Sequence, residues 1–121
     1  VRTKLRLAGP GVLNRKDCHN TEELVTMDSK TEVHPLDYFG FEEDGKVYWF
    51  DIRSIFQLSI ADLQPTNPYT RTKLTFDTRK RLKECVNHRD NRNLKLFHDP
   101  LHYGHSKHRT QTALQFLSFS F

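Results

Sequence analysis

The residues with the greatest potential for chemistry in this sequence are its histidines and cysteines. Cys85 and His88 have Cys-x-x-His spacing, and His102, His105 and His108 recur at every third position. Cysteine and histidine bind zinc, but a structural zinc ion needs four ligands in a closed geometry, and these spacings differ from those of known zinc fingers. We therefore predict no metal site and no cofactor, and we interpret Cys85 as a small buried thiol.

The sequence contains no recognisable catalytic motif. Cys18 and His19 are the residue types of a cysteine nucleophile and its base, but adjacent side chains rarely align for proton transfer. Neither a glycine-rich phosphate loop nor a nucleophile elbow is present. We interpret the many carboxylates of residues 17–51 as solvated charge. The sequence therefore favours a protein without an enzymatic activity of its own.

Length and composition indicate one small domain whose core depends on aromatic side chains. The chain has 121 residues, and only 36% of them are hydrophobic, but nine Phe, four Tyr and one Trp can each bury a large area. No stretch of about twenty apolar residues could span a membrane, and the basic N-terminus lacks the apolar centre of a secretory signal. With two cysteines, too few for a disulfide scaffold, we expect a reduced intracellular protein of the cytoplasm or nucleus.

Charge is distributed unevenly along the chain. The net charge is +4, yet residues 1–16 carry five basic residues and no acidic ones, whereas residues 17–51 carry ten acidic residues against two lysines. Residues 52–95 carry ten basic residues against four acidic ones. The basic second half could meet phosphates or an acidic protein surface, while the acidic first half opposes wrapping by nucleic acid.

The elements that would position these residues begin with a hairpin in YFGFEEDGKVYWFDI. Two aromatic runs flank Asp44-Gly45, and Asp-Gly between apolar stretches is a strong hairpin signal, here over residues 38–51. The second run is apolar on both faces. We therefore expect it to be covered on both sides, with Trp49 and Phe50 in the core.

Two helices joined by a proline-containing loop follow the hairpin. Apolar residues at helical spacing predict a first helix between Asp51, whose carboxylate suits an N-cap, and Pro65, which ends it. Asn67 and Pro68 predict a turn. A second helix is expected from about Asp77 to Asn87, and three of its residues should face the core: Leu82, Cys85 and Val86.

These elements together predict a small α+β domain over residues 13–95. We expect a basic, irregular arm before it (1–12), in which KLRL could form a short edge strand, and a His-rich C-terminal tail after it (96–121). The chain does not begin with Met, so a fragment or a processed product stays an open alternative.

The order of loop, hairpin, helix, proline-containing loop and helix resembles the U-box, the zinc-free relative of the RING finger in ubiquitin ligases. A U-box has a Gly-x-x-Tyr hairpin, a helix that starts near an Arg and an Ile, an Asp-Pro-x-Thr-Arg turn, and a Leu before the last helix. The matching residues here run from Asp17 to Val86: Gly45 and Tyr48, Arg53 and Ile55, NPYTR at 67–71, and Leu74.

A U-box does no chemistry itself; it holds a ubiquitin-conjugating enzyme and positions that enzyme's thioester. The resemblance implies a protein-interaction module in which Pro68 and Tyr69 contact such a partner together with Leu58 on the first helix, and Arg71 completes the candidate set. Any part in ubiquitin transfer would be that of a ligase-type scaffold without catalytic residues. The structural alternative is that Asn67 and Pro68 only make a turn, Tyr69 packs beneath it, and Arg71 ties the loop to a carboxylate.

The pairing FDIRSI…NPYTR also resembles a module in uncharacterised proteins of large DNA viruses and protist mobile elements. The upstream GPGVLNRKDCHN belongs to the same likeness. This second resemblance implies a viral or mobile-element origin, but it implies no activity because the module has no assigned role.

Nucleic-acid binding is the alternative function that the sequence supports. Lysines and arginines on one face of the second helix can neutralise phosphates without reading bases, although a solvated helix face is the structural alternative. Phe76 and Tyr69 could stack on bases, but we expect a small core to need them, and no known nucleic-acid-binding fold matches. The candidate residues for nucleic-acid binding are Lys73, Arg79, Lys80, Lys83 and Arg89.

Overall fold

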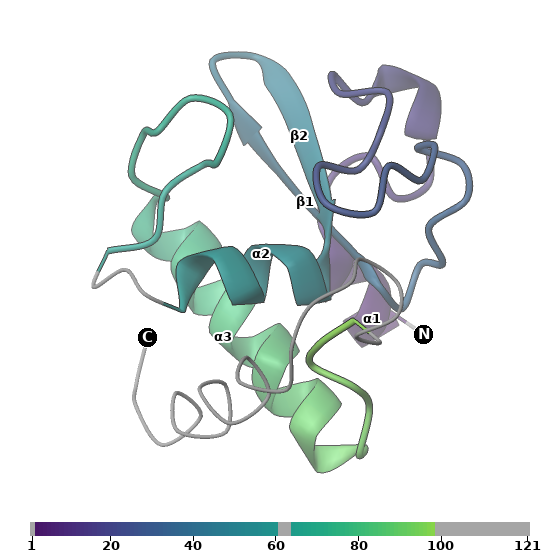
Figure 1. Ribbon diagram of the computed structural model, residues 1–121, viewed down its shortest axis with the longest axis vertical. Coiled ribbons are helices and arrows are strands. Elements are labelled where there is room, and N and C mark those ends of the chain that lie inside the picture. The colour runs from purple at the N-terminus through teal and green to yellow at the C-terminus, as the bar shows by residue number, and fades with distance from the viewer. Residues whose placement is uncertain (1, 61–63, 99–121) are drawn as a thin grey trace. The chain divides into compact units, whose positions relative to one another are not determined.

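The computed structural model describes residues 2–60 and 64–98, and it has an α+β fold, as the sequence predicts (Figure 1). The chain divides into two compact units, which we call the hairpin unit (Val1–Ile52) and the helical unit (Arg53–Phe121). This division falls inside the range 13–95 that the sequence analysis treats as one domain. No helix of the described residues has the length and apolar character needed to cross a membrane.

The predicted hairpin is confirmed. Strands β1 (Tyr38–Glu43) and β2 (Lys46–Asp51) pair antiparallel, and the two residues between them, Asp44 and Gly45, have φ angles of 51° and 77°. A two-residue turn with both φ angles positive matches the right-handed twist of the strands, and Asp-Gly adopts it at little cost. The local sequence therefore determines the register of the two strands.

Aromatic side chains on both faces of the hairpin are buried, as predicted for the second strand. Trp49 and Phe50 have no exposed surface. The ring of Tyr38 stacks on Trp49 at a centroid distance of 5.9 Å, and Phe41 stacks on Phe50 at 5.8 Å. Both pairs are diagonal neighbours across the two strands, a distance that aromatic side chains span.

The expectation of an irregular arm or an edge strand at the N-terminus is wrong. Residues Arg2–Ala8 form helix α1, and Gly9 ends it with a φ of 87° and an N–H bond to the Leu5 carbonyl. Glycine is the usual residue at this left-handed position after a helix. Leu7 and Ala8 are buried, and Ala8 belongs to the core cluster that also contains Trp49.

Two polar side chains, the half-buried Asn20 and the buried Glu23, hold the long loop between α1 and β1. The Asn20 side chain donates to the Trp49 carbonyl (3.0 Å) and accepts from the Trp49 amide (3.1 Å), while the Asn20 carbonyl accepts from the indole Nε1 (2.6 Å). Glu23 is fully buried, and its carboxylate accepts backbone N–H bonds from Val25, Thr26 and Asp51 at 2.8–3.0 Å. The interpretation of the carboxylates of 17–51 as solvated charge is therefore wrong for Glu23, whose partners are backbone amides, and for Asp51, which is also buried.

The helical unit contains the two predicted helices with shifted ends. Helix α2 (Ile52–Ser59) is shorter than expected within the described residues, and the Ser59 hydroxyl donates to the Ile55 carbonyl in its last turn (2.6 Å). Helix α3 (Phe76–Asn91) starts one residue earlier and ends four residues later than expected. Thr75 is its N-cap, since the Thr75 hydroxyl accepts from the Thr78 amide (3.2 Å).

The segment after α3 returns to α2. Asn93 takes a left-handed conformation (φ 56°), and the Arg89 guanidinium donates to the Lys95 carbonyl. The rings of Phe97 and Phe56 meet at 5.5 Å, and the His98 Nε2 lies 2.8 Å from the Ser54 hydroxyl. Residues 96–98, which the sequence analysis assigns to the tail, are thus part of the packed helical unit, while the remainder of that tail lies outside the described residues.

Candidate interaction surfaces

The NPYTR segment forms a closed loop around Asn67, which is fully buried. The Asn67 amide donates to the Thr72 carbonyl (2.8 Å), the Asn67 carbonyl accepts from the Arg71 amide (2.7 Å), and the Asn67 side-chain oxygen accepts from the Tyr69 amide (3.0 Å). Below these bonds, the Leu74 amide donates to the Pro65 carbonyl (2.9 Å) and closes the base of the loop. We call residues 67–73 the recognition loop.

Arg71 has the unusual backbone of this loop. Its φ angle is 65°, the left-handed region that non-glycine residues enter at a cost of about 1–2 kcal/mol. The bond from the Arg71 amide to the Asn67 carbonyl holds this conformation. Backbone strain that the surrounding structure maintains occurs often in functional loops. The left-handed Arg71 therefore makes this loop a candidate functional site.

The recognition loop presents its aromatic side chain to solvent. Tyr69 is 41% exposed and Arg71 is exposed, while Pro68 is half-buried. Leu58, the remaining member of the predicted partner-binding set, is 43% exposed on α2. The prediction that Tyr69 packs in the core is therefore wrong. Three members of the set share one loop, and the fourth lies on the helix before it in the same unit.

A second surface lies along one face of α3. Phe76, Arg79, Lys80 and Lys83 follow the i, i+3, i+4, i+7 spacing of one helical face and line a pocket of about 220 Å³. Phe76 is 69% exposed, so the expectation that the core needs its ring is wrong. We call this surface the α3 pocket.

Charged groups of the α3 pocket lie close to its aromatic ring. The Arg79 guanidinium carbon is 5.9 Å from the centroid of the Phe76 ring, a cation–π distance. Within the part of the chain that the structure describes, the buried Arg79 Nε has no hydrogen-bond partner. Such unpaired buried groups are uncommon in proteins, and each one asks for an explanation.

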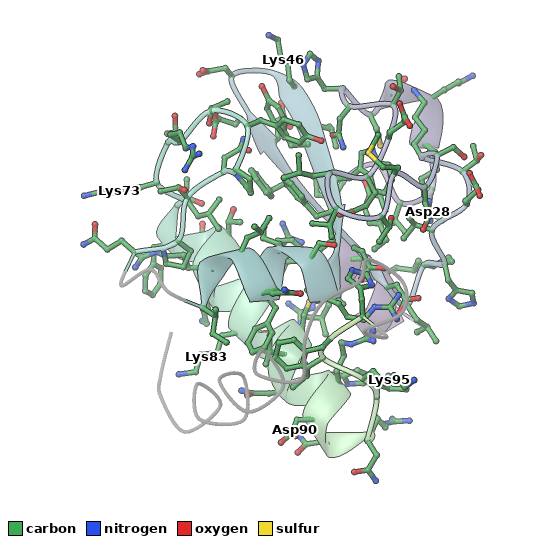
Figure 2. The ribbon with its side chains drawn as sticks, in the orientation of Figure 1. Asp28, Lys46, Lys73, Lys83, Asp90 and Lys95 are labelled. Carbon is green, nitrogen blue, oxygen red and sulfur yellow. The ribbon has the colours of Figure 1, made fainter. Side chains whose placement is uncertain are left out.

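The remaining two nucleic-acid candidates differ in their placement. Lys73 is exposed on the recognition loop, and Figure 2 shows its side chain extending away from the ribbon. Arg89 is only 5% exposed, and both Nε and Nη2 donate to the Lys95 carbonyl. Arg89 is therefore wrongly predicted as a nucleic-acid contact, because it faces inward and ties the end of α3 to the segment that follows.

The cysteine and histidine candidates are spread over the structure. Cys18 and Cys85 are both buried, and neither forms a disulfide bond. The exposed His19 packs its ring edge-to-face on Tyr48 at 5.1 Å. In residues 2–60 and 64–98, no group of three or more His, Cys, Asp or Glu side chains is arranged to hold a metal ion. The His102, His105 and His108 series lies outside the described residues.

Comparison of the chain with protein-family models, with curated proteins and with solved structures finds no match. The U-box resemblance therefore stays a prediction that depends on the motif residues named above. The two surfaces of the helical unit are the structural basis for the functional proposals that follow.

Proposed function

We propose that this chain is a non-catalytic protein-interaction module whose binding surface is the recognition loop together with Leu58 of α2. One observation carries the proposal: the loop is built around a fully buried Asn67 while its aromatic side chain points outward. A turn that only connects two helices needs neither the left-handed Arg71 nor an exposed Tyr69. A surface for a partner uses both.

Preorganisation is the physical reason that such a loop favours binding. A flexible loop loses conformational freedom when a partner orders it, and this loss weakens the complex. The hydrogen bonds of Asn67 to residues 69, 71 and 72 restrict the loop before any partner arrives. Tyrosine and arginine are also enriched among the residues that dominate binding energy at interfaces, and this loop exposes one of each.

The partner that we propose is a ubiquitin-conjugating enzyme. The support for this choice is the U-box resemblance, in which the equivalent proline loop and helix hold that class of enzyme. In this proposal the chain contributes no reacting group and acts as a ligase-type scaffold.

The test is an NMR titration of the labelled chain with a panel of ubiquitin-conjugating enzymes. We expect shift changes concentrated at Leu58 and residues 67–73, and we expect Tyr69→Ala to weaken binding at least tenfold, as the loss of an interface anchor does. Thr72→Ala is the matched control, because Thr72 is an exposed residue of the same loop. If no enzyme of the panel binds, the assignment of the partner fails.

A second measurement tests the interaction surface itself. Proteins captured from cell extract by the wild-type chain are compared with those captured by Tyr69→Ala, after circular dichroism has shown that the variant is folded. Loss of the same proteins with Tyr69→Ala but not with Thr72→Ala supports the recognition loop as the binding surface. Unchanged capture by the Tyr69 variant would show that the loop is only structural.

A further inference from the structure

The α3 pocket combines an aromatic ring and three cations on two consecutive turns of one helix. We propose that it is a subsite for single-stranded nucleic acid, in which a base stacks on Phe76 and the neighbouring phosphates lie against Arg79, Lys80 and Lys83. This function is additional to partner binding by the recognition loop and uses different residues.

The cations of the pocket fit the phosphate part of the ligand. Within residues 76–83 there are four basic residues and one acid, Asp77, which is not among the residues that line the pocket. A guanidinium and two ammonium groups on one face can neutralise successive phosphates and release their counterions. The buried Arg79 Nε has no hydrogen-bond partner among the described residues, so no carboxylate of that part of the chain accepts a bond from this nitrogen.

The exposed ring of Phe76 decides which polyanion fits best. An acidic peptide would use the cations and leave the ring without a role, whereas every nucleobase has a flat face that can stack on an aromatic side chain. In a duplex those faces are covered by neighbouring bases, so a stacking ring favours single strands. The position of Phe76, beside Arg79 and 69% exposed, therefore favours single-stranded nucleic acid over both a duplex and an acidic protein.

The size of the pocket limits the proposal to a subsite. Its volume of about 220 Å³ is below the roughly 300–1,000 Å³ of pockets that enclose whole small ligands. One unit of a longer strand can occupy such a space while the remainder of the strand stays in solvent.

The test is fluorescence anisotropy of the full chain with a labelled twelve-nucleotide single strand and a duplex of equal length. We expect tighter binding of the single strand and an affinity that falls about 7- to 18-fold between 50 and 200 mM salt, as neutralisation of two to three phosphates of a single strand implies. Phe76→Leu keeps an apolar side chain but removes the stacking ring, so it should weaken binding by about 5- to 150-fold.

Charge variants complete the experiment. Lys80→Gln should weaken binding and reduce the dependence on salt, whereas Arg92→Gln, which removes one exposed charge near the end of α3, should change neither. Tyr69→Ala should leave nucleic-acid binding intact. The test of nucleic-acid binding at the α3 pocket is therefore independent of the test of partner binding at the recognition loop.

Three results would overturn the proposal. The first is the absence of binding to the single strand at 50 mM salt. The second is equal affinity for single strand and duplex together with an unaffected Phe76→Leu variant, which would indicate a general polyanion surface. The third is displacement of the oligonucleotide by polyglutamate at equal charge concentration, which would indicate a site for an acidic protein.

Discussion

Replacement of Trp49 provides the most direct test of how the hairpin unit is held together. The Trp49 side chain is fully buried, stacks on Tyr38, and donates its indole N–H to the Asn20 carbonyl. Truncation of a buried tryptophan to alanine typically costs about 3–5 kcal/mol. Because small domains have about 5–15 kcal/mol of total stability, Trp49→Ala should remove a large part of it.

Trp49→Phe separates the hydrogen bond from the packing. Phenylalanine keeps an aromatic ring beside Tyr38, but it leaves the Asn20 carbonyl without the indole donor. Loss of this part-buried hydrogen bond should cost about 0.5–1.5 kcal/mol, so Trp49→Phe should lie between the wild type and Trp49→Ala. Leu13→Ala is the control, since Leu13 is 81% exposed and its truncation should change stability by less than about 0.5 kcal/mol.

The measurement is urea denaturation followed by far-ultraviolet circular dichroism. Fluorescence is unsuitable because both variants lack the only tryptophan of the chain. The midpoint should fall with little change in slope if the fold is retained. A loss below about 0.5 kcal/mol for Trp49→Phe would refute the role of the indole bond, and a loss below about 1 kcal/mol for Trp49→Ala would refute the role of Trp49 in the core.

Two further stability predictions concern the buried polar side chains of the loops. Asn67→Ala leaves the Tyr69 amide without its acceptor and should cost about 1–3 kcal/mol in urea denaturation, against less than about 0.5 kcal/mol for Thr72→Ala; equal effects would contradict the role of Asn67. Glu23→Gln places an NH₂ group against backbone N–H donors and should likewise cost about 1–3 kcal/mol, and an unchanged midpoint would show that the carboxylate is dispensable.

Sequence reasoning succeeds here where the structure depends on neighbouring residues. Asp44-Gly45 specifies its turn because the required backbone angles are local, and the hairpin follows from it. The apolar spacing predicts the second helix, and Leu82, Cys85 and Val86 are buried as expected. The helix begins one residue before the predicted start, directly after Thr75, which is a residue type typical of N-caps.

Sequence reasoning fails where tertiary contacts decide the position of a side chain. Glu23 resembles its nine acidic neighbours in sequence, and only the fold brings three backbone amides to its carboxylate. Arg89 belongs to the same basic run as Lys83, but the chain after α3 turns back to give its guanidinium a carbonyl partner. Composition alone places Phe76 in the core, although its spacing puts it on the helical face of Arg79, Lys80 and Lys83. That spacing is the signal in the sequence for the α3 pocket.

A common principle connects the stability of this chain to its candidate surfaces. Because only 36% of its residues are hydrophobic, the chain has few apolar side chains that could anchor its loops by burial. Asn20 and Glu23 in the hairpin unit and Asn67 in the helical unit instead hold loop backbone by hydrogen bonds from the inside. A loop that is held through its backbone can leave its own large side chains outside. The exposure of Tyr69 follows from this arrangement, because the buried amide of Asn67 supplies the order that an inward-facing aromatic ring would otherwise have to supply.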